Sequence, residues 1–417
     1  MAAPLFAGVL AVLPLAPASA GEVAHARVVS ADPVGTTPHV LDGIVNAFAL
    51  IGGTVVVGGS FSEVREAGRS TRLSRSNLFA FDLATGKIDR RFAPEPDGPV
   101  HALAAGPDGS VLVGGAFFSA GGPGSRTGRG LARLSLADGS PVAGFSAPVQ
   151  GGDVSSLVLH GGKLYVGGDF TGIGRTRRTA LARVDPRTGA VDPAFTVTPG
   201  GGLGGALKVY AMAAGRDRLA VDGSFTTLDG LRRPQVGLID IGAARPSVTG
   251  WHTEAYAARC KDVFPSYVRG LDFSPDGQYF VVVTTGGAKG SRKLCDSAAR
   301  FETYSRADTV KPTWVNFTGG DSLYSVAVTG AAIYVGGHQR WLNNPRGSDS
   351  AGRGAVARPG IGAIDPTTGR ALTWNPTRVR GIGVKAFLAH KGGLLVGSDT
   401  THLGHEYHAR VGMFPLS

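Results

Sequence analysis

Arginine is concentrated in short polar segments that lie between apolar runs. A guanidinium group binds a carboxylate or a phosphate through two parallel hydrogen bonds, and the chain has a formal net charge of +11 at pH 7. The pattern therefore predicts a surface for an anionic partner, such as an anionic cell-wall polymer or glycan. The alternative, which stays open, is a solvated rim whose arginines bond to backbone carbonyls. The candidate ligand-binding residues are Arg72, Arg126, Arg177, Arg178, Arg232, Arg233 and Arg340.

A second interpretation is an enzyme that cleaves a carbohydrate by hydrolysis or elimination. Acidic and histidine side chains would carry such chemistry, and the candidates are His252, Asp262, Asp296 and His338. These residues form no recognisable catalytic motif in the sequence, and no motif predicts a cofactor. We therefore expect a binding or scaffold protein and keep the enzyme as the alternative.

The segment from His402 to His408 contains the residue types of a metal site. His402, His405, Glu406 and His408 are all possible ligands. In an extended strand, however, successive side chains point to opposite sides, so His405 and His408 would diverge. No H-E-x-x-H helix is present. We interpret this segment as a polar loop and predict no metal site.

A repeated unit must position these residues, because strand-like runs that end in a glycine pair recur along the chain. The first four begin 56, 53 and 55 residues apart, and the gap of 114 before the fifth equals two periods. Self-similarity at a fixed spacing indicates a repeat architecture. The runs are TVVVGGSF (54–61), SVLVGGAF (110–117), KLYVGGDF (163–170), RLAVDGSF (218–225) and AIYVGGHQ (332–339).

Each unit contains further short apolar runs joined by tight turns, such as VHALAAG (100–106) and GLARLSLADG (130–139). The runs are rich in β-forming residues and show no helical period. Four antiparallel strands in about fifty residues form the blade of a β-propeller. We therefore predict an all-β fold, a seven-bladed β-propeller of four-stranded antiparallel blades. The units start near Gly43, Pro99, Asp153, Val209, Tyr267, Leu323 and Ile382.

The two ends of the chain should meet in the last blade. The seventh unit ends before a fourth strand, and the segment PHVLDG (38–43) precedes the first unit without a partner there. We expect residues 38–43 to form the outer strand of the last blade and to close the ring, which would protect a sheet edge. Residues 27–417 would then form a single propeller.

Two recurring features are expected to serve packing. The glycine pairs should let the inner strands approach their neighbours closely. One aromatic residue recurs in the fourth strand of each unit, where it should fill the space between adjacent sheets. These aromatic residues are Phe92, Phe145, Phe195, Trp251, Trp314 and Trp374.

The two faces of such a ring should differ. The connections between second and third strands, and between units, are long and arginine-rich, whereas the other turns are short. Long irregular loops are where binding residues concentrate. Cys260 and Cys295 both fall in these long connections, in neighbouring units, so we expect them to form a disulfide.

The recurring pattern V-G-G-x-F … L-A-R-x-D-x-x-T-G-x-x-D-x-x-F resembles the delta-sixty β-propeller repeat of bacterial secreted proteins. The resemblance is close in the first four units, partial in the sixth and poor in the fifth and seventh. It implies a propeller and export from the cell. It implies no activity, because that family supplies no catalytic residues.

The N-terminus resembles an export signal. Residues 1–20 form a short apolar run that ends in Ala18-Ser19-Ala20, a small-residue cleavage motif, and Ala24-His25-Ala26 offers a second motif, at which cleavage would follow residue 26. We therefore expect a secreted, extracellular protein that does not insert into a membrane. We expect it to be a monomer, and we do not expect nucleic acid as its partner.

Overall fold

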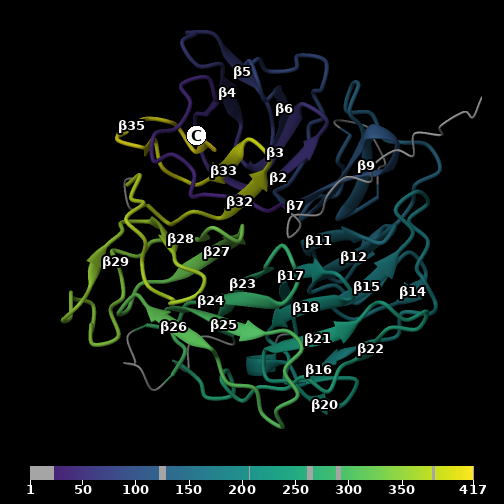
Figure 1. Ribbon diagram of the computed structural model, residues 1–417. Helices are drawn as coiled ribbons and strands as arrows, with labels where there is room; N and C mark the ends of the chain where they lie inside the picture. Colours follow the sequence, from purple (N-terminus) through teal and green to yellow (C-terminus); the bar gives the residue numbers. More distant parts are fainter. Residues whose placement is uncertain are drawn as a thin grey trace, which may run out of the picture.

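Seven main antiparallel sheets follow one another along the described part of the chain (Figure 1), with five small sheets at the periphery. The computed structural model describes residues 23–121, 128–205, 207–260, 266–287, 293–377 and 381–416. These residues contain two single-turn 3₁₀ helices, Pro107–Gly109 and Leu203–Gly205, and no α-helix. The predicted leader, residues 1–20, lies outside the described residues.

Each sheet is built from an inner strand, a second strand and a third strand in chain order. The strands are β2 (Ile44–Ile51), β3 (Thr54–Ser60) and β6 (Leu78–Asp82) in sheet one; β7 (Val100–Ala105), β8 (Ser110–Gly115) and β9 (Leu131–Ser135) in sheet two; β11 (Val154–His160), β12 (Lys163–Gly168) and β15 (Leu181–Val184) in sheet three; β17 (Val209–Gly215), β18 (Arg218–Gly223) and β21 (Val236–Asp240) in sheet four; β23 (Val268–Phe273), β24 (Tyr279–Thr284) and β25 (Ser297–Glu302) in sheet five; β27 (Leu323–Val328), β28 (Ile333–Gly337) and β31 (Ile361–Ile364) in sheet six; and β32 (Ala386–His390), β33 (Gly393–Gly397) and β36 (Val411–Pro415) in sheet seven.

The fourth strand is regular in only two sheets. Sheet four adds β22 (Ser247–Val248) and sheet five adds β26 (Trp314–Phe317). In four other sheets a single bridge marks its place, for example Leu134↔Pro141 in sheet two. Proline has no backbone N–H to donate to a ladder, so a strand that begins at Pro141 pairs poorly. The prediction of four full strands in each sheet therefore overstated the pairing.

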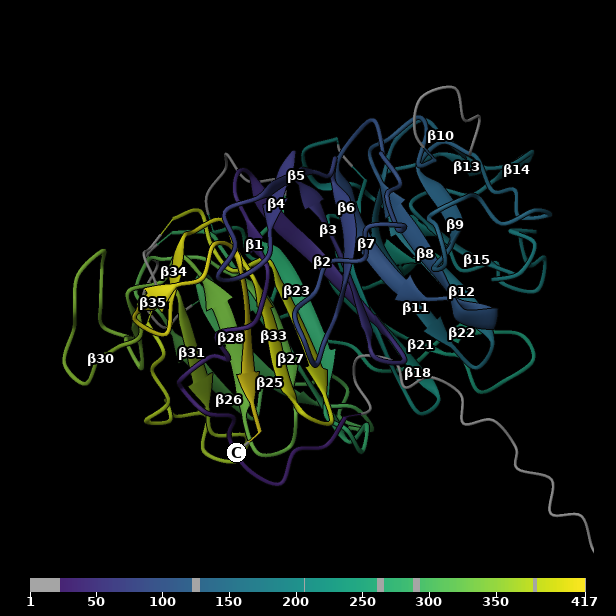
Figure 2. The same cartoon turned by 90° about the horizontal axis from the view of Figure 1, so that it is seen from above.

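The inner strands lie next to one another around a common centre (Figures 1 and 2). Each inner strand contacts the inner strand of the next sheet, and β32 of sheet seven also contacts β2 of sheet one. The glycine pairs make this approach possible. A Cβ on Gly114 would lie 2.6 Å from a methyl group of Val154 in the next sheet, and a Cβ on Gly397 would lie 2.6 Å from a methyl group of Val45.

The recurring aromatic residues fill space between neighbouring sheets, as predicted. The Trp251 ring, which follows sheet four, lies 5.3 Å from the ring of Phe280 in sheet five. The Trp374 ring lies 5.5 Å from the ring of Phe414 in sheet seven. Both tryptophans are buried. Such contacts stabilise a fold mainly through burial of apolar area.

Small peripheral hairpins project from five of the connections between second and third strands. They are β4–β5 (Glu63–Arg65, Arg72–Ser74), β13–β14 (Gly172–Ile173, Thr176–Arg177), β19–β20 (Thr227–Leu228, Leu231–Arg232), β29–β30 (Trp341–Leu342, Val356–Ala357) and β34–β35 (His402–Leu403, Glu406–Tyr407). Three of these hairpins are extended by a two-residue strand from the preceding connection: β1 (His39–Val40), β10 (Val149–Gln150) and β16 (Pro199–Gly200). We call the side of the molecule to which these connections project the loop-rich face.

The segment 38–43 lies between the first and last units and is not the strand beside β36. Its Val40 amide donates to Ala409 O, shortly before β36, at 3.0 Å. Its residues His39 and Val40 form β1, which pairs with β4 of the first unit. The neighbour of β36 is an earlier segment instead, because the Ser30 amide donates to Pro415 O and the Val34 amide donates to Met413 O. Val29 is buried in the apolar cluster of sheets six and seven, and Val23 and Val28 are partly buried against it, which explains why this stretch takes the outer position.

Candidate functional site

Three of the arginines predicted to bind a ligand already have carboxylate partners. Their ion pairs have N–O distances between 2.6 and 3.0 Å and join Arg72 to Glu63, Arg232 to Glu254, and Arg340 to Asp321. The first two pairs are exposed and contribute little to stability, whereas Asp321 is buried and accepts two hydrogen bonds from the Arg340 guanidinium. Each pair does, however, neutralise a charge that an anionic ligand would need.

The other predicted arginines vary in their surroundings. Arg233 is buried and donates to the carbonyl oxygens of Arg232 and Thr249, both at 2.6 Å. Arg178 donates to the carbonyl of Arg177 at 3.0 Å. The guanidinium of Arg177 is exposed and has no ion pair among the described residues. Arg126 lies outside the described residues, and ligand binding by this rim stays a prediction.

A second set of polar side chains gathers at the start of the seven inner strands. In six sheets the register of the inner pair shifts across this residue, as at Val209/Ala211, which is a β-bulge. Bulges often re-aim a side chain next to a functional site. All seven side chains are half-buried. They are Asn46, His101, Ser155, Tyr210, Arg269, Tyr324 and Lys385, and we call this set the axial layer.

Side chains of the axial layer converge from different sheets. The guanidinium carbon of Arg269 lies 5.1 Å from the centroid of the Tyr210 ring. The Lys385 Nζ lies 3.5 Å from the centroid of the Tyr324 ring. The positive charge of Arg269 also contributes to lowering the pKa of Lys385, although sheets five and seven are not neighbours. The two cations therefore lie near the common centre of the inner strands.

These two cations are desolvated without a matching anion. Within the described part of the chain, neither Arg269 nor Lys385 forms an ion pair with a carboxylate; Arg269 donates to its neighbour's carbonyl, Val268 O, at 2.7 Å. Burial lowers the pKa of Arg269, and burial lowers the pKa of Lys385 to about 8. An anion that binds beside half-buried cations stabilises them, because it compensates for the hydration that burial has removed.

Carboxylates outside the layer offset its positive charge in part. The charge of Asp399 raises the pKa of Lys385, and the charges of Asp153 and Asp169 act on His101. Asp222, behind Arg269, is fully buried and accepts a hydrogen bond from the Ala211 amide at 2.9 Å. Burial raises the pKa of Asp222 to about 7, so it balances only part of one charge at neutral pH. Burial and the charge of Lys208 lower the pKa of His101, which makes its imidazole neutral. The axial layer can therefore hold an anion and supply hydroxyl and amide groups around it.

The layer residues share a position in the sequence repeat. The layer residue is always the second residue of the inner run, as in V-Y-A, V-R-G and V-K-A. Strict alternation would assign that residue to one face of its sheet. A bulge changes that assignment, and no residue type marks the bulge in advance.

The residues of the predicted enzyme site do not assemble. His252 Nε2 lies 2.7 Å from Glu254 Oε1 in the connection after sheet four, and Asp296 is buried directly before β25. His338 does reach the axial layer, since its Nδ1 lies 3.3 Å from the Tyr324 hydroxyl. Asp262 lies outside the described residues. The layer itself has no carboxyl side chain, whereas most glycoside hydrolysis uses two.

The histidine-rich segment forms the hairpin β34–β35 and its surroundings. His402 is exposed. The Nδ1 atom of His405 lies 3.2 Å from Thr377 Oγ1. His408 is buried, and its Nδ1 atom lies 3.2 Å from Thr37 Oγ1. Among the residues that the structure describes, no cluster of three or more His, Cys, Asp or Glu side chains could hold a metal ion.

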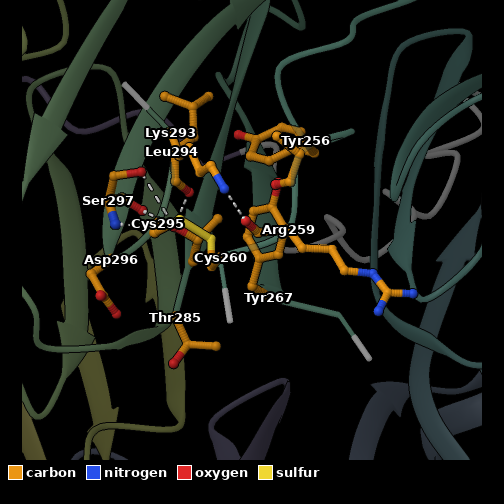
Figure 3. The surroundings of a disulfide bond; sticks show 12 residues. Tyr256, Arg259, Cys260, Tyr267, Thr285, Lys293, Leu294, Cys295, Asp296 and Ser297 are labelled. Atoms are coloured by element: carbon orange, nitrogen blue, oxygen red, sulfur yellow. Dashed lines mark hydrogen bonds between the residues drawn. A yellow bond between two sulfur atoms is a disulfide. The ribbon is translucent and has the colours of Figure 1, made fainter. Parts of the chain in front are cut away.

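The predicted disulfide is present. Cys260 and Cys295 are bonded, with their Cα atoms 5.8 Å apart, and link the connection after sheet four to the loop before β25 (Figure 3). Tyr256 and Tyr267 lie beside the bond, and the Tyr267 hydroxyl donates to Ala258 O at 2.8 Å. The bond therefore closes a buried aromatic cluster at the edge of sheet five.

Comparison with known proteins supports the fold but gives no activity. Residues 106–145 and 162–195 match a family described as a domain of unknown function (DUF5122), β-propeller. The WD40 β-propeller domain of Doa1 has a TM-score of 0.52 and 12% identity, over 94% of this chain and 97% of that chain. The computationally designed Ika8 protein has a TM-score of 0.49 and 13% identity, over 92% of this chain and 99% of that one. No curated protein matches.

The family match, the likeness to the WD40 domain of Doa1 and the all-β architecture show a β-propeller fold. They support a β-propeller repeat family for part of the chain, but not the narrower delta-sixty family. In the described part of the chain, no helix is long and apolar enough to cross a membrane.

Proposed function

We propose that this protein is a binding module, a seven-bladed β-propeller that holds an anionic ligand at its axial layer. The observation that carries the proposal is the pair Arg269 and Lys385, two half-buried cations from non-adjacent sheets without a carboxylate partner among the described residues. Hydrogen bonds between charged groups are about twice as strong as neutral ones. An anion there would replace water around both cations.

The ring would be closed by the residues around Ser30 to Val34, which lie beside β36, and by the contact of β32 with β2. This arrangement would fix the seven layer residues relative to one another. A rigid ring is a suitable support for a binding site, because preorganised groups lose little freedom when a ligand binds.

The axial layer is a stronger candidate than the peripheral arginines. Three of those arginines are neutralised by carboxylates, whereas the axial cations are not. An anionic polymer or glycan remains the proposed ligand class for the loop-rich face, where exposed Arg177 would contribute. Such a polymer would place one anionic group at the axis and others over the rim.

We also propose that the protein is exported and that cleavage follows Ala20. The disulfide supports export, since disulfides persist in oxidising compartments. His25 is buried, its amide donates to Thr329 O, and its ring bonds to His390 O. Cleavage after residue 26 would remove these contacts. Mass spectrometry of the secreted protein should therefore give Gly21 as its first residue.

The test is binding of butyrate, sulfate and polygalacturonate by calorimetry at low and high salt. We expect Arg269→Met and Lys385→Met each to weaken binding about tenfold or more, since a hydrogen bond to a charged group contributes roughly 1.5–3 kcal/mol. For butyrate and sulfate, which are too small to reach the rim, Arg177→Met is the matched control, because it removes an exposed charge away from the axis. Unchanged affinity in the two axial variants would refute the axial site.

A further inference from the structure

The inner strands enclose an apolar chamber on the other side of the axial layer. Its volume is about 600 Å³, within the range of pockets for small organic ligands. All seven inner strands contribute to its wall, and most lining side chains are Leu, Val, Ala, Phe or Met. Val23, near the start of the described chain, also lines it.

The chamber begins directly beside the axial layer. In every inner strand, the residue two positions after the layer residue lines the chamber; these seven are Phe48, Leu103, Leu157, Met212, Leu271, Val326 and Phe387. Two residues of extended strand span about 7 Å. The backbone positions of Arg269 and Lys385 therefore lie about 7 Å along the strand from residues that line the chamber.

The chamber carries almost no charge at neutral pH. Asp272 lines it and is buried, and burial raises the pKa of Asp272 to about 8. His390 also lines it, and burial lowers the pKa of His390 to about 4. Lys391 is the one permanent charge in the lining and is exposed. Contact with this wall would add no binding free energy for a charged polymer. An apolar chain would bind there favourably, because its surface would be removed from water.

We propose that the axial layer and the chamber form one site for an anionic amphiphile. Its anionic head would lie at Arg269 and Lys385, and its hydrocarbon chain would occupy the chamber. This inference rests on the proposed function, because it assumes that the axial layer binds the head. It adds the chemistry of the rest of the ligand. The two cations at one end of the site select an anionic head, and the uncharged apolar wall at the other end selects a hydrocarbon chain.

The test compares ligands that differ in chain or in head. Butyrate, octanoate and dodecanoate share a carboxylate, dodecanol lacks the charge, and dodecyl phosphate carries a phosphate head. Each methylene buried in the chamber should tighten binding about fourfold until the chamber is full. Dodecanol should bind at least tenfold more weakly than dodecanoate. The tighter of dodecanoate and dodecyl phosphate identifies a fatty acid or a phospholipid-type head as the source.

The outcomes separate the two proposals. If butyrate and dodecanoate bind equally well, the proposed anion site stands and the amphiphile site is refuted. If neither butyrate nor dodecanoate binds, both are refuted. If dodecanol binds as tightly as dodecanoate, the chamber binds apolar chains without help from the axial cations, and the proposal of one combined site is wrong.

Variants of the chamber provide an independent check. Ala104 and Ala105 line it and are half-buried, so Ala105→Phe should fill part of it. We expect this variant to keep the butyrate affinity and to lose at least tenfold in dodecanoate affinity. Ala137→Phe, at an exposed turn of the same unit, should change neither. If Ala105→Phe does not fold, Ala105→Leu should give a smaller loss in the same direction, and an unchanged dodecanoate affinity in a folded variant would overturn the proposal.

Discussion

Lys385 precedes the inner strand of sheet seven, and its Nζ lies 3.5 Å from the centroid of the Tyr324 ring in sheet six. A cation over an aromatic ring is stabilised by the ring quadrupole, and more so where water is excluded. The contact therefore holds the ammonium toward the axis, although the charge of Arg269 opposes it. Because burial and the charge of Arg269 lower the pKa of Lys385 to about 8, Lys385 is the cation of the axial layer that titrates near neutral pH.

Anion binding should weaken above pH 8. Burial lowers the pKa of Lys385 to about 8, so its positive charge is present below that pH and is lost above it. Arg269 keeps its charge throughout, and Asp399 is the acidic group whose charge raises the pKa of Lys385. We expect the butyrate affinity to fall about tenfold between pH 7 and pH 9, since losing one charged hydrogen bond costs roughly 1.5 kcal/mol. Calorimetry at constant ionic strength measures this.

Lys385→Arg is the control for that titration, because arginine stays protonated across this range. Its butyrate affinity should fall less between pH 7 and pH 9 than that of the native protein, and the remaining decline should follow the ionisation of Asp222, whose pKa burial raises to about 7. The same decline in Lys385→Arg as in the native protein would assign the pH dependence to another group.

Folding stability should decrease as the pH rises from 5 to 8. Burial raises the pKa of Asp272 to about 8, although the amides of Val328 and Phe273 donate to it. Between the pKa of Asp in the unfolded chain and this value, the folded protein binds more protons. The free energy of unfolding therefore falls by up to about 1.4 kcal/mol per pH unit through this group.

The substitution Asp272→Asn removes this titration while keeping an oxygen for the Val328 amide. We expect urea unfolding of the variant to depend less on pH than that of the native protein over pH 5–8. Parallel curves for the two proteins would show that Asp272 is ionised in the folded state, contrary to its environment.

The sequence repeats predicted much of this architecture, because each repeat records a short-range packing requirement that recurs in the sheets. The first glycine of a pair must be glycine where a neighbouring valine methyl approaches, as at Gly58 and Gly114, so the pairs recur in four of the sheets and reveal the period. The disulfide could be predicted because Cys260 and Cys295 are the two cysteines of the chain and the repeat places them in adjacent connections.

Other features depend on interactions that no local pattern encodes. The outer strand of the last sheet was predicted at residues 38–43. The residues around Ser30 and Val34 lie there instead, because Tyr334 and Trp374 bond to this stretch. The axial layer depends on bulges, which place Tyr210 and Arg269 toward the centre. Neither residue differs by type from an ordinary strand residue.

Removing the disulfide should destabilise the protein substantially. The bond joins residues 35 apart in sequence, and the chain-entropy model assigns roughly 3–4 kcal/mol to a loop of this size. We expect Cys260→Ser combined with Cys295→Ser to lower the free energy of unfolding by about this amount in urea titrations. The native protein after reduction should behave likewise, and a loss below about 1 kcal/mol in both would mean that the bond adds little to the fold.

The proposed closure of the ring can be tested at Gly397 and Val45, which belong to sheets seven and one. A Cβ at Gly397 would lie 2.6 Å from Val45 Cγ1, so Gly397→Ala should cost about 1–3 kcal/mol through overpacking. Gly250→Ala is the matched control, because no heavy atom lies within 4 Å of a Cβ there. Its effect should be within about 0.5 kcal/mol of zero.

A double-mutant cycle then identifies the source of the clash. In the Val45→Ala background the methyl group is absent, so Gly397→Ala should be less destabilising by about 1 kcal/mol or more, as expected for residues in contact. Urea titration of the four proteins provides the coupling free energy. Additive effects would mean that sheet seven does not pack on sheet one in solution. The seven layer residues would then have no closed ring to hold them around one axis, and the axial site would lose its structural basis.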